Sequence, residues 1–346
     1  WRMKYREMLT PDSFYVNLNG LEQWAKTAEK PMDRAVLNSL IAGIYSDYAS
    51  RNRWQIFQRP NIVDETPSAD IREWSGNMFV QQVMQHTTEA LKDKELLLAT
   101  SARIYIPFVE LGDASEYYRH DMLHLLGSRG VDALRNVNGL DKDSVVNAGI
   151  ENIYQEMLDT YKRVNMDDGY VLTMLNYLDW RRNSDNTFVP YRAPQKLIGL
   201  TQDPYLAGLD KLRTEFKTHD ICAEVYLAKA RYAIEKGQQA MALQICDEAV
   251  RLYPDYKRIN ALKNLKLEIP ALYVRADEVA YPGADMKLMV NHKNLDGFTV
   301  RLYQEKKLVA EEHYSLLCPE NYQERDTVFT FKAPAEGSYV MRIVPD

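Results

Sequence analysis

Cysteine, excess basic charge and long apolar runs are all scarce in this chain of 346 residues. Its three cysteines cannot build a disulfide framework, and no Cys-x-x-Cys pair is present to hold zinc. The formal net charge of -6 disfavours a nucleic-acid partner, because phosphate binding needs a concentrated basic face. No run approaches the roughly 20 apolar residues of a membrane-spanning helix. Since Gly-x-Ser-x-Gly and glycine-rich phosphate loops are also missing, we expect no nucleic acid, no membrane span and no cofactor.

The composition is that of an ordinary globular protein. Hydrophobic residues make up 46% of the chain and charged residues 27%, which is enough apolar surface for real cores. Single cores rarely grow past roughly 250 residues. The length therefore predicts two domains.

The stretch from Ala223 to Pro254 has the clearest pattern. It predicts two antiparallel helices joined at Gly237, with small residues at Ala230, Ala242 and Ala249 where the backbones approach closely. This spacing is typical of one tetratricopeptide unit of about 34 residues. A single unit cannot bury its own apolar face, so more helices are expected to stack before it. We therefore predict an all-α, tetratricopeptide-like array over residues 1–268, with the repeat unit near 222–256.

Helical periodicity recurs through the rest of this region. We expect helices over residues 21–29, 31–48, 70–84, 94–110, 114–126, 150–161, 171–180 and 256–268. Asp70 and Glu73 form a potential capping box for the third of these. Pro107 is expected to kink or end the fourth.

After Pro270 the apolar period changes from 3.6 to 2. Strands are predicted at 271–276, 286–292, 298–303, 308–316, 326–332 and 338–344, separated by turn signals such as Asp296-Gly297. So many short strands without an intervening helix must pair antiparallel. Residues 269–346 are therefore predicted to form a small antiparallel β-sandwich.

The segment His120-Asp121-Met-Leu-His124 is the strongest candidate for chemistry. Two histidines four residues apart share a helix face, as zinc chelation requires, but a metalloprotease needs glutamate where Asp121 stands. Together with His86, the same residues could serve a helical metal-dependent phosphohydrolase. The alternative is that these polar groups cap and cross-link helices, with both histidines facing solvent or a neighbouring helix. We favour this second interpretation and expect no catalytic, cofactor or metal residues.

Another segment, Cys318-Pro319-Glu320-Asn321, has a spacing that resembles an internal thioester. Asparagine stands where the thioester needs glutamine, and the segment falls in a predicted loop, where water would hydrolyse the bond. We therefore interpret it as coincidental. The 23 tyrosines are expected mainly to pack with their hydroxyls at the edge of the core.

Several segments together resemble the N-terminal region of the large alpha-2-macroglobulin-like proteins of Bacteroidetes. They are Asp70-Ile-Arg-Glu-Trp74, Tyr118-Arg-His-Asp-Met-Leu-His124, Gly169-Tyr-Val-Leu through Tyr177-Leu-Asp-Trp-Arg181, the repeat from Ala242 to Pro254, and Val290-Asn-His-Lys-Asn294-Leu. The resemblance implies a helical lead-in followed by the first macroglobulin-type sandwich. It also implies an endopeptidase inhibitor of the periplasm or cell envelope, which traps proteases when they cleave a bait loop.

On this basis we expect a non-catalytic scaffold or interaction segment. Its partners would be proteases, reached through the full-length protein, and other envelope proteins. No bait loop or thioester is recognised in these residues, and the chain opens at Trp1 without a signal segment. Two alternatives stay open: a stand-alone peptide- or protein-binding repeat protein of the envelope, and a metal-dependent hydrolase using His120, Asp121 and His124.

Overall fold

A computed structural model describes residues 13–60, 70–106, 112, 117, 120–184, 203–268, 271–317 and 324–346. The chain divides into two compact units, Trp1–Gly208 and Leu209–Asp346, called unit 1 and unit 2 below. Helices fill unit 1, and unit 2 contains helices followed by strands. The expected order of helices and then antiparallel strands is therefore confirmed.

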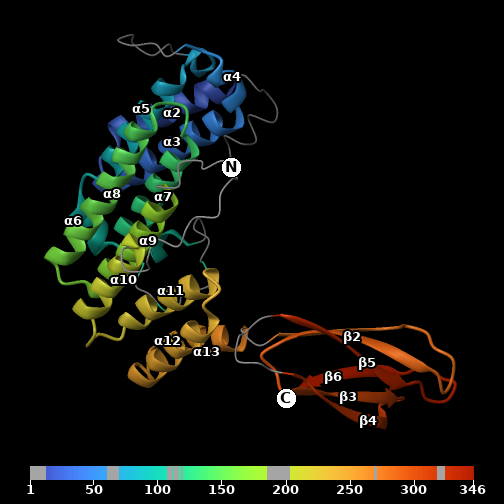
Figure 1. The fold of residues 1–346 in the computed structure, drawn as a ribbon. Coiled ribbons are helices and arrows are strands. Elements are labelled where there is room, and N and C mark those ends of the chain that lie inside the picture. The colour runs from blue at the N-terminus through green and yellow to red at the C-terminus, as the bar shows by residue number, and fades with distance from the viewer. Residues whose placement is uncertain are drawn as a thin grey trace. The chain divides into compact units, whose positions relative to one another are not determined.

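Unit 1 is built from helices (Figure 1). The described helices are α2 Ser13–Thr27, α3 Pro31–Arg51, α4 Arg53–Phe57, η1 Ile71–Glu73, α5 Gly76–Ala90, α6 Lys94–Ala99, η2 Ala102–Tyr105, α7 Met122–Asn136, α8 Asp143–Arg163 and α9 Asp167–Ser184; α10, Pro204–Glu215, crosses the division between the units. Helix α3 packs on α5 and α7, and α8 packs on α7 and α9.

One continuous core joins these helices. Its fully buried members include Phe79 on α5, Met122 on α7 and Tyr161 on α8. Aromatic rings link segments distant in sequence: Tyr45 of α3 stacks on Trp74, which lies between η1 and α5, with ring centroids 5.1 Å apart. The helical stripes predicted from the sequence therefore face a shared interior.

Helix bounds differ from the predictions where a capping side chain decides them. Asp70 caps as expected, but it accepts from the Arg72 amide and starts the 3-10 turn η1, while α5 begins only at Gly76. The helix expected over 94–110 ends at Ala99 and is followed by η2; Pro107 lies outside the described residues. The first helix, expected over 21–29, is α2, which begins earlier, at Ser13, and ends at Thr27.

The helix predicted over 114–126 is wrong at its start. Helix α7 begins at Met122, because the Asp121 carboxylate accepts a hydrogen bond from the His124 amide at 2.8 Å and so forms the N-cap. An N-cap residue has extended backbone angles, which interrupts a helix on its N-terminal side. His120 therefore precedes the helix.

In unit 2, α11 Cys222–Glu235 and α12 Gln239–Leu252 pack against each other, and α13, Ile259–Glu268, packs on both. Gly237 has a φ of +73° between α11 and α12, a conformation that glycine adopts without steric cost. Ala230, Ala242 and Ala249 are all 0% exposed. The two helices and their small buried residues lie where the sequence predicts them.

The substitution Ala242→Leu tests the close contact at this hairpin. Because Ala242 is completely buried, three extra carbons must displace neighbouring atoms, and we expect a loss of about 1–3 kcal/mol of unfolding free energy. Ala240→Leu, at an exposed position of the same helix, is the control and should be nearly neutral. Equal melting temperatures for wild type and both variants would contradict the tight packing.

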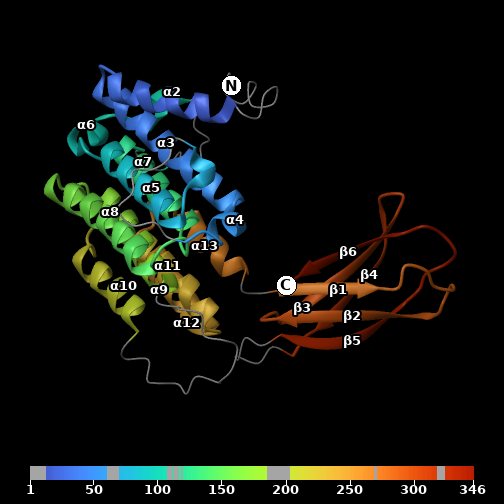
Figure 2. The ribbon, with the colours of Figure 1, turned by 90° about the horizontal axis from the view of Figure 1, so that it is seen from above.

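The strands are β1 Ala271–Ala276, β2 Asp285–Lys293, β3 Gly297–Gln304, β4 Lys307–Ser315, β5 Arg325–Lys332 and β6 Val340–Pro345. They form two three-stranded sheets, ordered β1-β2-β5 and β4-β3-β6 (Figure 2). Each described pair is antiparallel. The predicted strands therefore match the observed ones within two residues at each end.

Both sheets contribute to one apolar cluster. Leu288 and Val290 of β2 and Phe331 of β5 come from the first sheet, while Phe298 and Val300 of β3 come from the second. Alternate residues of each strand point inward, which is the reason for the period of 2 in the sequence. The boundary predicted at 268/269 falls beside residues 269–270, which lie outside the described part, and stays a prediction.

Candidate functional site

The histidines considered for a metal site do not share one helix face in the structure. His120 lies before α7 and His124 in its first turn, with their ring centroids 6.4 Å apart. His86 belongs to α5 and hydrogen-bonds Asn38 of α3. In the part of the chain that the structure describes, no group of three or more His, Cys, Asp or Glu side chains is placed to hold a metal ion.

Asp121 is buried and fully engaged in hydrogen bonds that hold helices together. Its residue is 2% exposed, and its carboxylate accepts from the Tyr161 hydroxyl at 3.0 Å (Oδ1) and 3.2 Å (Oδ2), in addition to capping α7. Burial, together with the charge of Asp121, raises the pKa of Tyr161 far above its usual range, so the phenol stays a donor. The carboxylate thus joins the start of α7 to the last turn of α8.

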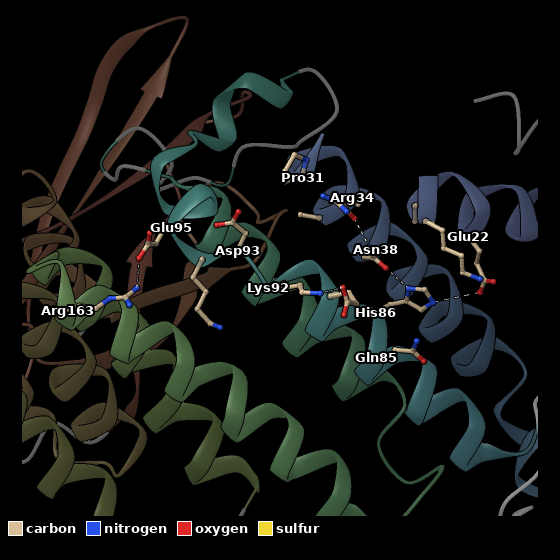
Figure 3. A pocket seen from close by; sticks show the side chains of 15 residues that line it. Glu22, Pro31, Arg34, Asn38, Gln85, His86, Lys92, Asp93, Glu95 and Arg163 are labelled. Atoms are coloured by element: carbon tan, nitrogen blue, oxygen red, sulfur yellow. Dashed lines mark hydrogen bonds and ion pairs between the residues drawn. The ribbon is translucent and has the colours of Figure 1, made fainter. Parts of the chain in front are cut away.

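A larger cavity, of about 790 Å³, lies among α2, α3, α5, α6 and the end of α8 (Figure 3). Its polar lining comes from Glu22, Lys26, Arg34, Asn38, Gln85, His86, Glu89, Lys92, Asp93, Lys94, Glu95 and Arg163. No serine, threonine or cysteine is among its lining residues. This excludes a hydroxyl or thiol nucleophile from its described wall.

A hydrogen-bonded network lies in the wall of this cavity. The Asn38 amide donates to the Arg34 carbonyl at 2.8 Å, which turns Oδ1 of Asn38 toward Nδ1–H of His86 at 2.7 Å. Nε2 of His86 then faces Oε1 of Glu22 at 3.8 Å, and Figure 3 shows both contacts. The Tyr45 hydroxyl donates to the same Glu22 oxygen. One histidine thereby connects α2, α3 and α5.

The electrostatics of the network keep Glu22 ionised. Interaction with His86 holds the pKa of Glu22 below its usual range, against the opposing effect of burial, and Tyr45 adds to the lowering. Burial and the same carboxylate raise the pKa of Tyr45 well above normal. A catalytic base would need a pKa near the working pH, whereas this carboxylate is shifted away from it.

The three other acids among the described lining residues, Glu89, Asp93 and Glu95, also have partners. Glu89 pairs with Lys92 at 3.3 Å, and Glu95 pairs with Arg163 at 3.6 Å. Asp93 caps α6 by accepting from the Leu96 amide at 3.1 Å. These contacts hold the helices in position, and among the described lining residues no hydroxyl or thiol nucleophile stands beside a base.

The thiols do not form a reactive centre in the described residues. Cys222 and Cys246 are both free and buried. Burial raises the pKa of both thiols, that of Cys246 to about 11, which keeps them protonated and unreactive at neutral pH. Cys318 and the thioester-like segment lie outside the described residues.

Sequence reasoning named His86 but missed its partners. Asn38 is 48 residues away along the chain, and Glu22 and Tyr45 contribute from two further positions on α2 and α3. No local spacing carries that information, because tertiary packing brings these residues together. Only the polarity of Asn38 and His86 on otherwise apolar helix stripes could have indicated it.

Comparisons with known proteins identify no relative of this chain. No family model matches the chain, and no curated protein or solved structure matches it significantly. Among the helices that the structure describes, none combines the length and apolar character needed to cross a bilayer.

Proposed function

We propose that this chain is a non-catalytic interaction scaffold, in which a tetratricopeptide-like helical array carries a small β-sandwich. The observation that carries the proposal is the α11–Gly237–α12 hairpin, with Ala230, Ala242 and Ala249 completely buried. Helical hairpins of this kind stack side by side and present extended surfaces to protein partners.

The side chains considered for catalysis already make structural hydrogen bonds, and this supports a non-catalytic role. Asp121 caps α7 and accepts from Tyr161, and Glu22 accepts from Tyr45 beside His86. Groups used in this way position helices. The common core of the two sheets supports the sandwich, because facing sheets bury alternate residues between them.

The sequence resemblance gives the scaffold a context. We propose that it forms the N-terminal part of an alpha-2-macroglobulin-like, protease-trapping protein of the cell envelope or periplasm. Support for this step comes from the quoted segments, from Asp70–Trp74 to Val290–Leu295, and from the order of helices and then a β unit. Trapping itself would depend on a bait loop elsewhere in such a protein.

A direct test of the non-catalytic assignment uses purified protein. We expect no peptidase or phosphatase turnover with Zn²⁺, Mn²⁺ or Mg²⁺ added, and no stoichiometric metal by elemental analysis. His120→Ala and Asp121→Asn serve as matched variants. Turnover that either substitution abolishes would overturn the assignment and restore the hydrolase alternative.

A separate test addresses the trapping context. The product of the complete reading frame is incubated with an endopeptidase, and residual activity is measured on a short peptide and on a large protein substrate. An enclosed protease should keep its activity on the short peptide and lose it on the large protein. Equal activity on both substrates would count against trapping and favour a stand-alone binding protein.

A further inference from the structure

The outer face of the sheet β1-β2-β5, turned away from the shared apolar cluster, exposes three large apolar side chains. Tyr273 of β1, Met289 of β2 and Val328 of β5 are 68%, 46% and 61% exposed. Met289 pairs directly with Val328, and Tyr273 lies diagonally across from Met289, so the three side chains are neighbours on one face. Adjacent exposed apolar groups of this kind mark interaction surfaces.

Charged side chains of both signs surround this apolar group. Alternation along the strands places the cations Arg275, Lys287, Lys293 and Lys332 on this face with the acids Asp285 and Asp326, while Asp277 and Glu324 stand at its ends, just after β1 and just before β5. The cations and the acids balance, so the face as a whole favours neither a polyanion, such as a nucleic acid or an anionic membrane, nor a polycation. A complementary partner therefore carries both signs as well.

The charges along β2 and β5 follow the same order about the apolar centre. The outward residues of β2 are, in chain order, Asp285, Lys287, Met289, Asn291 and Lys293. An acid therefore stands four residues before Met289 and a cation four residues after it. On β5, Glu324 stands four residues before Val328, and Lys332 four residues after it. Both strands are thus acidic at the N-terminal end of the face, apolar in the middle and basic at the C-terminal end.

A second copy of the chain fits this face after half a turn about an axis that crosses the strands at Met289. The rotation lays each strand on its own copy with the two ends exchanged, and the interface is then isologous. Met289 meets the second copy's Met289, and Val328 meets the second copy's Val328. Two sheets packed face to face in this way bury the apolar centre of both.

The same rotation brings opposite charges together at both ends of the face. Lys293 faces the second copy's Asp285, and Lys332 faces the second copy's Glu324; because the contact is isologous, each pair forms twice. Arg275 meets a like charge, that of its own copy, but it lies on the outer strand β1, where its long side chain reaches solvent. The other facing pairs join a charge to a neutral polar group: Lys287 with Asn291, Asp326 with Thr330, and Asp277 with Tyr273.

We propose that the outer face of the sheet β1-β2-β5 is a self-association surface, through which two copies of this chain form an isologous dimer. Exposed ion pairs contribute little each, so the apolar centre supplies the attraction and the charges set the register. Three strands about 4.8 Å apart and about 26 Å long give a flat face of about 400 Å². A standard interface buries roughly 800 Å² on each partner, so this dimer is weak and reversible. The surface goes beyond the scaffold role, and a monomeric chain would leave that role untouched.

Sedimentation equilibrium of the full chain tests the proposal. We expect a reversible monomer–dimer equilibrium with a Kd of roughly 10–100 µM. Val328→Asp places a charge against its own copy near the axis and should weaken dimerisation at least about tenfold. Val340→Asp is the matched control, because Val340 is also a valine with 61% exposure but lies on β6 of the other sheet. It should leave the Kd unchanged, and both variants should melt nearly as the wild type does, since both positions are exposed.

A charge exchange along β2 tests the register. Asp285→Lys or Lys293→Glu alone puts like charges opposite each other and should weaken the dimer about tenfold, whereas the double variant restores opposite signs and should recover the wild-type Kd. The two positions lie at opposite ends of β2, about 26 Å apart, so no contact within one chain can cause this rescue. A monomer at all concentrations up to about 0.5 mM, equal effects of Val328→Asp and Val340→Asp, or a double variant as weak as the single ones would each overturn the proposal.

Discussion

Arg258→Ala should lower the unfolding free energy of the helical part of unit 2 by about 3–5 kcal/mol. Nη1 of Arg258 donates to both carboxylate oxygens of Glu224 at 3.0 Å, and the Tyr256 hydroxyl donates to Oε1 at 2.9 Å. Glu224 is only 7% exposed. Removal of the guanidinium takes two charge-assisted hydrogen bonds away from a buried carboxylate, which costs far more than the loss of a surface pair.

The measurement has to distinguish the two units. All five tryptophans, Trp1, Trp24, Trp54, Trp74 and Trp180, belong to unit 1, so tryptophan fluorescence reports that unit and should not change. Native-state hydrogen exchange of peptides from α11–α13 should show the loss. A loss below about 1 kcal/mol, as for an exposed pair, would contradict the prediction.

A triple variant separates the missing charge from the missing contacts. Glu224→Leu, Tyr256→Phe and Arg258→Met together replace the polar cluster by apolar side chains of similar size. Buried ion pairs replaced in this way are often neutral in stability. We therefore expect the triple variant to recover most of what Arg258→Ala loses.

Gly76→Ala should destabilise unit 1 by about 3 kcal/mol. A Cβ at Gly76 would stand 2.0 Å from the Leu140 carbonyl oxygen and 2.9 Å from its carbon. Both are backbone atoms, so no side-chain rotation relieves the contact, and the start of α5 must move away from the segment that follows α7. Urea unfolding followed by tryptophan fluorescence measures the loss, since Trp74 is 5% exposed and only two residues away.

Gly20→Ala makes the same change where there is space. Gly20 is exposed within α2, and a Cβ there would meet no atom within 4 Å. An alanine in a helix interior is more stable than glycine by about 0.5–1 kcal/mol. The two alanine substitutions should therefore change the unfolding free energy of unit 1 in opposite directions. Stabilisation by both would show that the contact between α5 and Leu140 is loose.

The sequence predicted the β region well because two independent signals coincide there. Period-2 alternation marks the strands, and turn residues such as Asp296-Gly297 mark their ends, so the predicted 286–292 became Asp285–Lys293. The turn at Glu305 and Lys306 was not foreseen. Both residues have positive φ, 48° and 71°, the pattern of a type I′ hairpin, without the glycine that normally indicates it.

Helix starts and cavities were harder to predict, for physical reasons. An apolar stripe from Tyr118 to Leu126 looks continuous, but the Asp121 side chain prefers the amide of His124 and sets the start of α7. His124 was considered for metal binding. In the structure it lines a cavity together with Tyr154 of α8 and Thr173 of α9, which come from other helices. Packing between helices assembles such sites, and helical periodicity only states which face is buried.

The topology of the β region has a consequence for how it melts. Among the described strands, only the middle one of each three-stranded sheet, β2 or β3, is bonded on both sides, and the four outer strands each have one ladder. Detachment of a middle strand therefore removes both ladders of its sheet at once. Because Leu288, Val290, Phe298 and Val300 of these two strands also face the shared apolar cluster, the region is expected to melt cooperatively, with β2 and β3 as its last protected segments.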